Sequence, residues 1–392
     1  MKNVYIVAAK RTPMGSYGGS LSSFTAPQLG AFAIDGALKS AGLTAESIDE
    51  VILGNVCSAN LGQAPARQAA LAAGLPQSVP CTTINKVCSS GMKSMMFGAM
   101  QIMTGQNEIV LCGGMESMSN VPYYIPNARW GYKYGDSKLV DGLARDGLVD
   151  AYDMQAMGVH ADSTAEEYGI SREDQDRFTI QSYERSAASA DNGLFEDEIV
   201  PVSVKQRRGP DLVVSEDEEI RKVRFDKIPQ LRPAFTKEGT VTAANASTIN
   251  DGGAAFILAS EEAVKKFNLS PLARIVAFAD AAREPQRFTT APVLAAQKIL
   301  KQSGKSLSEI DFYEVNEAFS VVTLAFNKEM GISEDQVNVN GGAVSLGHPL
   351  GASGARIVCT LNSVLKQKNA KTGLATLCNG GGGASAIIIE RV

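Results

Sequence analysis

This 392-residue sequence has few histidines and no long apolar run, which argues against a metal site built on histidine and against a membrane-spanning protein. The chain has only two histidines, which argues against a histidine-based metal site, and we expect no metal. No run of about 18 apolar residues occurs, so the sequence predicts no membrane-spanning helix. The first residues, MKNVYIVAAKRTPMG, lack the apolar core and the cleavage site of a signal peptide. We therefore expect a cytoplasmic protein.

Paired cysteines and basic runs are also missing. The chain has no CxxC pair, which disfavours both a disulfide framework and a zinc site and fits a reducing compartment. The six scattered cysteines are Cys57, Cys81, Cys88, Cys112, Cys359 and Cys378. The formal net charge is −5, and the sequence contains no sustained run of basic residues. This balance argues against nucleic acid or an anionic membrane as a main partner.

What the sequence does contain is a pattern of strands and helices that occurs twice. The stretches AGLTAESIDEVILGNVCSANLG and SGKSLSEIDFYEVNEAF each place Ile-Asp, an apolar strand, an asparagine and a helix in the same order. Later strands in each half, EIVLCGGMES and GLATLCNGGGGASA, run through Leu-Cys into glycines. The alternation predicts an α/β fold built from two similar βαβ-type halves, with parallel strands. Strand ends of such sheets are where sites form.

The repeat also predicts three parts of the chain. We expect an N-terminal half over residues 1–118 and 248–268, and a C-terminal half over residues 269–392. The repeat is interrupted over residues 119–247, which we interpret as a loop domain inserted into the first half. Within it, the aromatic and basic mixture at 123–138 predicts a docking or oligomer-contact loop.

Three side chains stand out as candidates for chemistry. Cys88 lies where the strand-like TTIN runs into a helix, so it is either an inert packing residue or a thiolate stabilised by the helix start. His348 lies in a glycine-rich loop before a helix, where it is either structural or functional. Cys378 ends a strand and would by default be a packing residue, but Asn379 and four glycines follow it.

Two other classes of function explain less of the sequence. A nicotinamide oxidoreductase predicts a GxGxxG turn after the first strand, and VYIVAAKRTPMGSYGG has none. NGGGGASA near the C-terminus is a weak dinucleotide loop, because no helix or acidic ribose partner follows it. A binding module for coenzyme A (CoA) or lipid without chemistry would not need Cys88, His348 and Cys378 together.

Long blocks of sequence carry a resemblance to a known family. NKVCSSGMKS, VNEAF, NVNGGAVSLGHPLGASGAR and LCNGGGGASA, in that order, resemble the signature blocks of the thiolase family, as do RTPMGSYGGSL and TAANASTINDGGAA. The similarity extends from about residue 3 to residue 390. It is strongest to the acetyl-CoA acetyltransferase branch, of the biosynthetic and mitochondrial type.

The resemblance implies a fold and a reaction. The fold would be the thiolase fold, a layered αβαβα core with an inserted loop domain. The reaction would be ping-pong Claisen condensation of two acetyl-CoA to acetoacetyl-CoA and CoA, reversible by thiolysis. Within the family, the alternative is a degradative 3-oxoacyl-CoA thiolase of broader chain length.

The resemblance also implies roles for five residues. Cys88 would be the nucleophile that carries the acyl group, and His348 would activate it and then bind the thioester oxygen. Cys378 would take the α-proton of the second acetyl group and protonate the leaving thiolate. Asn316 would hold a water that, with His348, binds the enolate oxygen. The backbone N–H groups of Cys88 and Gly380 would form the second oxyanion hole.

The remaining implied positions concern substrate and assembly. CoA would be a substrate, with no cofactor and no metal needed; a monovalent cation site, known in some relatives, cannot be read from the sequence. The resemblance also implies acyl-CoA partners and a homotetramer, a dimer of dimers, that uses the loop at 123–138. The substrate-contacting residues implied by the match are Ser247 at the pantetheine, Arg221 towards the nucleotide, and Leu148, Met157, Phe235, Phe288, Ala318 and Phe319 in the apolar tunnel and acyl pocket.

The sequence departs from the family pattern near that pocket. Ala156 stands where the biosynthetic pattern has histidine, and the other histidine of the chain, His160, lies four positions further on. Phe288 stands where many biosynthetic members carry methionine, and Ser89 stands where glycine is common. None of these changes removes a catalytic group, but the first two would alter acyl preference.

Overall fold

The centre of the protein is a continuous ten-stranded sheet, seen in a computed structural model that describes residues 2–392. Its strand order is β12-β13-β14-β11-β1-β10-β5-β3-β4, and β2 pairs with β10 beside this path. The strands are β1 (Val4–Arg11), β2 (Gly15–Ser16), β3 (Glu50–Gly54), β4 (Cys81–Ile84), β5 (Ile109–Ser117), β10 (Asn250–Ser260), β11 (Ala273–Ala282), β12 (Phe312–Val315), β13 (Thr372–Asn379) and β14 (Gly383–Arg391).

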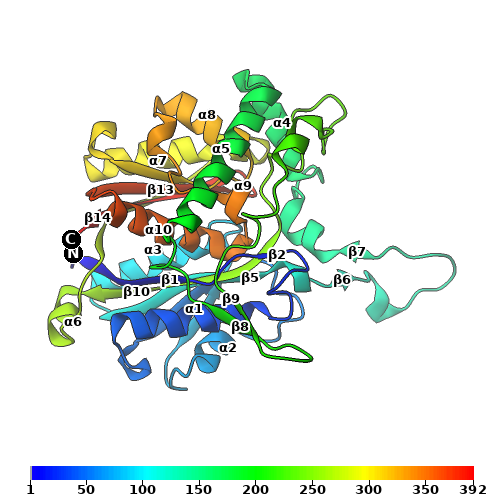
Figure 1. The fold of residues 1–392 in the computed structure, drawn as a ribbon. Helices are drawn as coiled ribbons and strands as arrows, with labels where there is room; N and C mark the ends of the chain where they lie inside the picture. The colour runs from blue at the N-terminus through cyan, green and yellow to red at the C-terminus, as the bar shows by residue number, and fades with distance from the viewer. Residues whose placement is uncertain (1) are drawn as a thin grey trace.

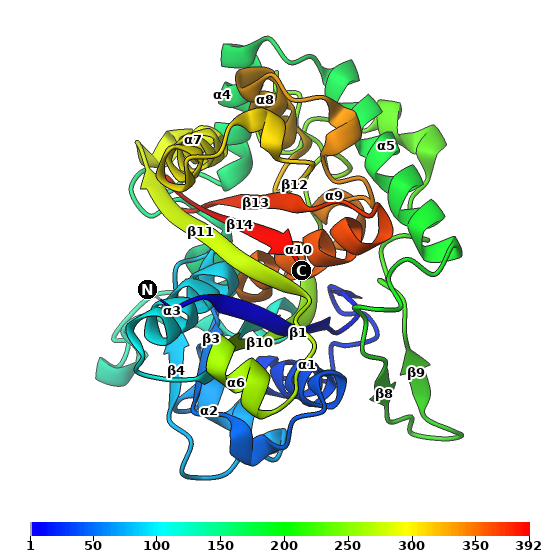
Figure 2. The ribbon, with the colours of Figure 1, turned by 90° about the vertical axis from the view of Figure 1, so that its left-hand side faces the viewer.

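The sheet is built from two halves with the same design. The order β3-β5-β10-β1 in one half matches β12-β13-β14-β11 in the other, with the same pairing directions. The halves meet where β1 pairs with β11 over only two residue pairs, Tyr5 with Arg274 and Ile6 with Ala273. Figure 2 shows β11 passing between the halves to reach β1. The predicted duplication is confirmed.

The strand directions differ in part from the prediction of parallel units. The pairs β3–β4, β3–β5 and β12–β13 are parallel, as expected for strands joined through helices. The pairs formed by β10 and β14 are antiparallel, so the prediction of parallel pairing is wrong for them. The reason for β14 is local: residues 380–382 turn the chain directly from β13 into β14, and so short a connection permits only antiparallel pairing.

Helices separate and cover the two halves of the sheet. Figure 1 shows α3 and α10 between the halves, α1 and α2 against the β1–β10–β5 side, and α7 and α8 against the β13–β14 side. This is the layered αβαβα arrangement that the resemblance implied. The helices are α1 (Ala26–Ala41), α2 (Pro65–Ala72), α3 (Ser90–Thr104), α4 (Met157–Tyr168), α5 (Arg172–Asp191), α6 (Glu261–Lys266), α7 (Ala291–Ser303), α8 (Ser320–Met330), α9 (Ala343–Leu346) and α10 (Leu350–Gln367).

Small residues let the two central helices come into close contact. A Cβ added at Gly91 in α3 would lie 2.7 Å from the backbone nitrogen of Ala355 in α10. A Cβ added at Gly354 would lie 2.6 Å from the backbone nitrogen of Met92. Side chains at either position would force the helices apart, because real Cβ atoms do not approach so closely. The two glycines therefore allow the N-terminal ends of α3 and α10 to pack closely against each other.

Between β5 and β10 the chain forms the inserted segment that the repeat predicted. Ser171 caps its helix α5, because Ser171 Oγ accepts the backbone N–H of Asp174 at 3.0 Å. The hairpin β6–β7 projects away from the core, and so does the hairpin β8–β9 (Figures 1 and 2). The hairpin strands are β6 (Tyr123–Tyr124), β7 (Val140–Asp141), β8 (Val202–Val204) and β9 (Leu212–Val214).

The exact division of the chain into three parts stays a prediction.

In the described residues, 2–392, no helix combines the length and the apolar character needed to cross a bilayer.

Candidate active site

Cys88 is held in a tight turn between β4 and α3, as the sequence predicted. Ser89 caps α3, so the thiol lies one residue outside the helix. Val87, directly before it, has φ of 48°, a left-handed conformation that is strained for a β-branched residue. Ser90 stabilises the turn, because its Oγ accepts the N–H of Lys86 at 2.8 Å and donates to the carbonyl of Val87 at 2.6 Å. The turn thus fixes the position of the sulfur.

His348 lies in the equivalent position before α10. Its backbone N–H donates to Asn250 Oδ1 at 3.0 Å, and its ring Nδ1 lies 2.6 Å from Ser353 Oγ. Ser353 donates its only hydroxyl hydrogen to the carbonyl of Pro349 at 2.8 Å, so its oxygen accepts from Nδ1–H. The proton of a neutral imidazole therefore lies on Nδ1. Nε2 is buried, has no hydrogen-bond partner among the described residues, and is left as the basic nitrogen.

Asn316 and Cys378 come from the ends of two neighbouring parallel strands, β12 and β13. The backbone N–H of Asn316 donates to the carbonyl of Thr376 at 3.1 Å, which fixes their relative position. The side-chain nitrogen of Asn316 lies 3.5 Å from His348 Nδ1, a contact too long for a strong hydrogen bond. Its side-chain oxygen faces Arg356, whose Nη2 donates at 3.4 Å. One of the predicted strand-end residues, Asn316, thus lies beside the predicted histidine.

The end of β13 also lies against the nucleophile turn. The backbone N–H of Gly380 faces the sulfur of Cys88 and opposes the rise in its pKa, and a charge on Cys88 would raise the pKa of Cys378. A Cβ added at Gly380 would lie 3.4 Å from Val87 and 3.9 Å from the terminal methyl of Met157. Three distant parts of the chain, around residues 88, 157 and 380, therefore meet in one place.

Burial controls the protonation of these groups. It raises the pKa of Cys88 to about 12, although the N–H of Gly380 opposes the shift. It also raises the pKa of Cys378. Burial, helped by the charge of Arg356, lowers the pKa of His348 to about 3. These shifts favour neutral thiols and a neutral imidazole, so burial works against the thiolate that the helix start would stabilise at Cys88.

Apolar residues implied by the resemblance gather around the second thiol. Phe288, Ala318 and Phe319 share a hydrophobic cluster with Cys378, and Met157 packs against it. The ring of Phe319 lies edge to face with that of Phe288, with 6.5 Å between the centroids. These contacts form the wall expected for an acyl pocket.

The other implied contacts are divided between the pocket and the surface. Phe235 stacks edge to face on Phe319 at 6.0 Å, and the backbone N–H of Ser247 donates to the carbonyl of Ala318 at 3.0 Å. Leu148 packs against the cluster that contains Cys88.

Arg221 is exposed, and no contact connects it with the catalytic candidates in the described chain. Its guanidinium donates to Asp191 at 2.7 Å and to Glu216 at 2.8 Å.

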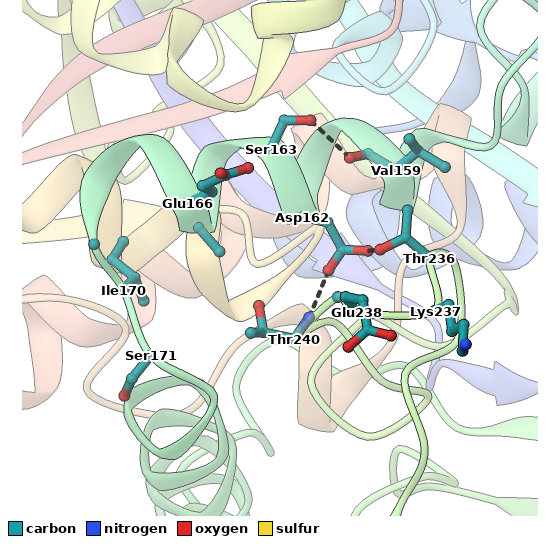
Figure 3. Close-up of a pocket in the computed structure, with 13 residues that line it drawn as sticks. Val159, Asp162, Ser163, Glu166, Ile170, Ser171, Thr236, Lys237, Glu238 and Thr240 are labelled. Atoms are coloured by element: carbon teal, nitrogen blue, oxygen red, sulfur yellow. Dashed lines mark hydrogen bonds between the residues drawn. The ribbon is translucent and has the colours of Figure 1, made fainter.

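A hollow elsewhere in the protein holds none of the catalytic candidates. It has a volume of about 780 Å³ and lies between α4 and the segment 236–240 (Figure 3). Its central carboxylate, Asp162, accepts the backbone N–H groups of Thr240 and Val241, each at 2.8 Å, and the hydroxyl of Thr236 at 2.8 Å. The oxygens of Asp162 are already paired, so this carboxylate braces the loop.

The sequence interpretation missed the residues that hold the catalytic candidates. Ser353 could have been found from its spacing, because it lies five positions after His348, on the first turn of α10. Glu116 gave no such signal, although it accepts the N–H groups of Val56 and Gly351 at 3.0 and 2.9 Å and so ties the chain after β3 to the start of α10. Burial raises the pKa of Glu116 to about 7.

Known proteins resemble the chain over its whole length. The family model described as thiolase, N-terminal domain, matches residues 4–262, and the thiolase C-terminal domain matches residues 269–391. An acetyl-CoA acetyltransferase of Schizosaccharomyces pombe is 56% identical over 390 residues, covering 99% of each chain. A protein of Gibberella zeae named acetyl-CoA acetyltransferase ERG10, cytosolic, is 53% identical and covers 99% of this chain and 98% of its own. These names do not favour the broader-chain alternative.

Solved structures agree in fold as well as in sequence. The Acat5 thiolase from Ascaris suum, in complex with coenzyme A, superposes with a TM-score of 0.95 at 48% identity, covering 100% of both chains. Human mitochondrial 3-ketoacyl-CoA thiolase in complex with CoA has a TM-score of 0.96 at 42% identity, covering 100% of this chain and 98% of its own. The matched family models and the full-length relatives lead to one conclusion: this chain belongs to the thiolase family.

Proposed function

We propose that the chain is an acetyl-CoA acetyltransferase, which condenses two acetyl-CoA to acetoacetyl-CoA and CoA and catalyses the reverse thiolysis. The observation that carries this proposal is the meeting of Cys88, at the start of α3, with the end of β13, which supplies Cys378 and the N–H of Gly380. His348 enters from the start of α10, which packs on α3. The names of the full-length relatives support acetyl groups as the substrate.

In the first half-reaction, Cys88 takes the acetyl group. Its sulfur attacks the thioester carbonyl while its proton passes to Nε2 of His348, the nitrogen left basic by Ser353. The N–H groups of Cys88 and Gly380 stabilise the oxyanion of the tetrahedral intermediate. When the bond to CoA breaks, Cys378 gives its proton to the CoA thiolate. The products are acetyl-Cys88, CoA, a thiolate at Cys378 and an imidazolium at His348.

In the second half-reaction, the thiolate of Cys378 and the imidazolium of His348 return to their neutral forms. The Cys378 thiolate removes an α-proton from a second acetyl-CoA. The enolate oxygen is stabilised by the imidazolium N–H of His348 and by a water held on Asn316. The enolate carbon attacks the carbonyl of acetyl-Cys88, a carbon–carbon bond forms, and the sulfur leaves. His348 returns its proton to Cys88, so every group regains its first state and acetoacetyl-CoA is released.

The pocket wall supports a short acyl group. Phe288 is 3% exposed and lies edge to face with Phe319, so this wall is filled by aromatic rings close to Cys378. CoA acts in this scheme as a substrate, and the residues named supply every proton transfer without a cofactor. The neighbouring solved structures that contain CoA support acyl-CoA molecules as the small-molecule partners.

Assembly and location belong to the same proposal. The β6–β7 hairpin carries large side chains that are strongly exposed, including Trp130 at 85% and Tyr134 at 104% of full exposure. Exposed aromatic groups of this size are typical of protein–protein contacts. We therefore propose a homotetramer, a dimer of dimers joined through these hairpins. The relative named cytosolic supports a place in the cytoplasm.

The activity is tested with an acyl-CoA profile of the purified protein. Thiolysis rates on acetoacetyl-CoA, 2-methylacetoacetyl-CoA and longer 3-oxoacyl-CoAs are compared, with the Cys88→Ser variant as the blank. The proposal expects acetoacetyl-CoA to have the highest kcat/KM. A higher kcat/KM on long 3-oxoacyl chains would overturn the acetyl assignment, and equal rates in the Cys88→Ser variant would overturn the mechanism.

A further inference from the structure

Asp150, Asp153 and His160 bring three potential metal-ligand atoms together outside the site described above. One atom from each residue lies within 4.8 Å of the other two, and no other such group occurs in residues 2–392. Nε2 of His160 is 3.4 Å from Oδ2 of Asp153. Two ligand atoms bound to one tetrahedral zinc ion, each at about 2.0–2.1 Å, lie roughly 3.3 Å apart. The observed spacing of this pair therefore fits a shared ion.

Two of the three side chains are buried and have atoms without partners. His160 is 4% exposed, and its Nε2 has no hydrogen-bond partner among the described residues. Asp150 is 2% exposed; its Oδ1 accepts the N–H of Tyr152 at 2.8 Å, whereas its Oδ2 has no partner in the same residues. Burying a carboxylate oxygen and a ring nitrogen without partners is unfavourable. A cation between them would satisfy both.

The backbone around the cluster is already fixed. The N–H of Asp150 donates to the carbonyl of Gln155 at 2.8 Å, and the N–H of Met154 donates back to the carbonyl of Asp150 at 3.1 Å. The N–H of Gln155 donates to Oδ1 of Asp153 at 3.0 Å, which leaves Oδ2 facing His160. His160 itself lies in the first turn of α4. Little rearrangement is needed to bring the ligand atoms into a coordination sphere.

We propose that Asp150, Asp153 and His160 bind one divalent transition-metal ion of the zinc class, with water completing the coordination. One imidazole and two carboxylates are a ligand set that zinc takes, and the two carboxylates balance its charge. Magnesium and calcium fit less well, because they prefer six or more oxygen ligands. The side chain of Asp153 is 25% exposed, so the ion and its water can reach the site.

This site runs against the expectation of no metal, which rested on the scarcity of histidine. One histidine suffices here because two carboxylates supply the other protein ligands. A left-handed residue, Met154 with φ of 62°, lies in the turn between Asp153 and the helix that carries His160. The turn also joins Leu148 to Met157, so a bound ion would hold in place the segment between two residues of the expected substrate pocket. The inference does not depend on the proposed reaction.

Zinc binding by the full-length protein tests the proposal. The untagged Cys88→Ser protein is stripped with a chelator and titrated with Zn²⁺ in a calorimeter, since removing that thiol removes a competing zinc ligand. We expect one Zn²⁺ per chain and a rise in Tm on loading, because an ion that binds only the folded state stabilises it. Adding Asp153→Asn or His160→Ala should weaken binding at least about tenfold and abolish the rise in Tm.

Glu166→Gln, which changes an exposed carboxylate on the same helix, is the matched control and should bind zinc unchanged. The partly exposed Asp153 gives a mild variant that keeps the test valid if His160→Ala does not fold. The proposal is overturned if Zn²⁺ leaves the Tm unchanged, because the three side chains would then hold no ion. It is also overturned if Asp153→Asn binds zinc as the parent does, or if Mg²⁺ binds as tightly as Zn²⁺.

Discussion

Ser353 Oγ lies 2.6 Å from Nδ1 of His348 and at the same time donates its hydrogen to the carbonyl of Pro349. The hydroxyl can therefore only accept from the imidazole, which places the ring proton on Nδ1 and the lone pair on Nε2. The two residues are five positions apart, at the point where the loop enters α10. One turn of helix thus selects the tautomer that can accept the proton of Cys88.

Replacing Ser353 with alanine should lower kcat by roughly 10- to 100-fold, because the imidazole loses the group that fixes its tautomer and orientation. The measurement is steady-state thiolysis of acetoacetyl-CoA, with circular dichroism to check the fold. Ser363→Ala is the matched control, since Ser363 lies on the same helix and donates only to the carbonyl of Cys359. Equal losses in both variants would show that the effect comes from the helix and not from the histidine.

The raised pKa of Cys88 predicts how its alkylation depends on pH. Below a pKa of about 12, the thiolate fraction of Cys88 rises about tenfold for each unit by which the pH is raised. Inactivation by iodoacetamide should therefore become steadily faster from about pH 6.5 to about pH 9.5. Acetyl-CoA should protect, and mass spectrometry should find the label on Cys88. A rate that stays level across this range would indicate a thiolate–imidazolium pair, contrary to the neutral pair inferred here.

Cys378→Ala should separate the two half-reactions. Cys88 and His348 remain, so the variant should still take an acetyl group from acetyl-CoA, although more slowly, because Cys378 no longer protonates the leaving CoA thiolate. Intact-protein mass spectrometry detects this acetyl group as a covalent label. Condensation should fall by roughly 100-fold or more, because no base remains to remove the α-proton. Cys112→Ala is a suitable control, since this cysteine occupies the repeat-related strand β5 within the core. Full condensation by the Cys378→Ala variant would remove the role given to that thiol.

The sequence predicted the elements of the site better than their environment. The positions of Cys88, His348 and Cys378 followed from the order of strands and helices, since each lies where one element ends or the next begins. The protonation state of Cys88 could not be predicted, because the helix start favours thiolate and only the packed structure shows that burial opposes it more strongly. The approach of Asp153 to His160 was equally hidden, because the turn between them contains one left-handed residue, Met154.

Replacing the buried Arg11 should lower the stability of the protein strongly. Arg11 is fully buried, donates to both oxygens of Asp217 at 2.6 and 2.9 Å, and donates to Glu198 at 2.6 Å. Arg11→Met should cost about 3–5 kcal/mol of unfolding free energy, because two carboxylates would be left in the interior without their cation. Lys39→Met, which breaks an exposed pair with Asp35, should cost less than about 0.5 kcal/mol. Guanidinium unfolding followed by circular dichroism compares the two variants.

The β6–β7 hairpin predicts the assembly state. If its exposed rings join two dimers, replacing Trp130 and Tyr134 together with serine should remove the apolar contact area and halve the mass measured by light scattering after size-exclusion chromatography. Val213→Ser is the control, because Val213 is 61% exposed on the other projecting hairpin, β8–β9, and should leave the mass unchanged. A tetramer that persists in the double variant would place the contact between dimers on another surface, since the loss of two large aromatic groups should weaken a contact made through this hairpin.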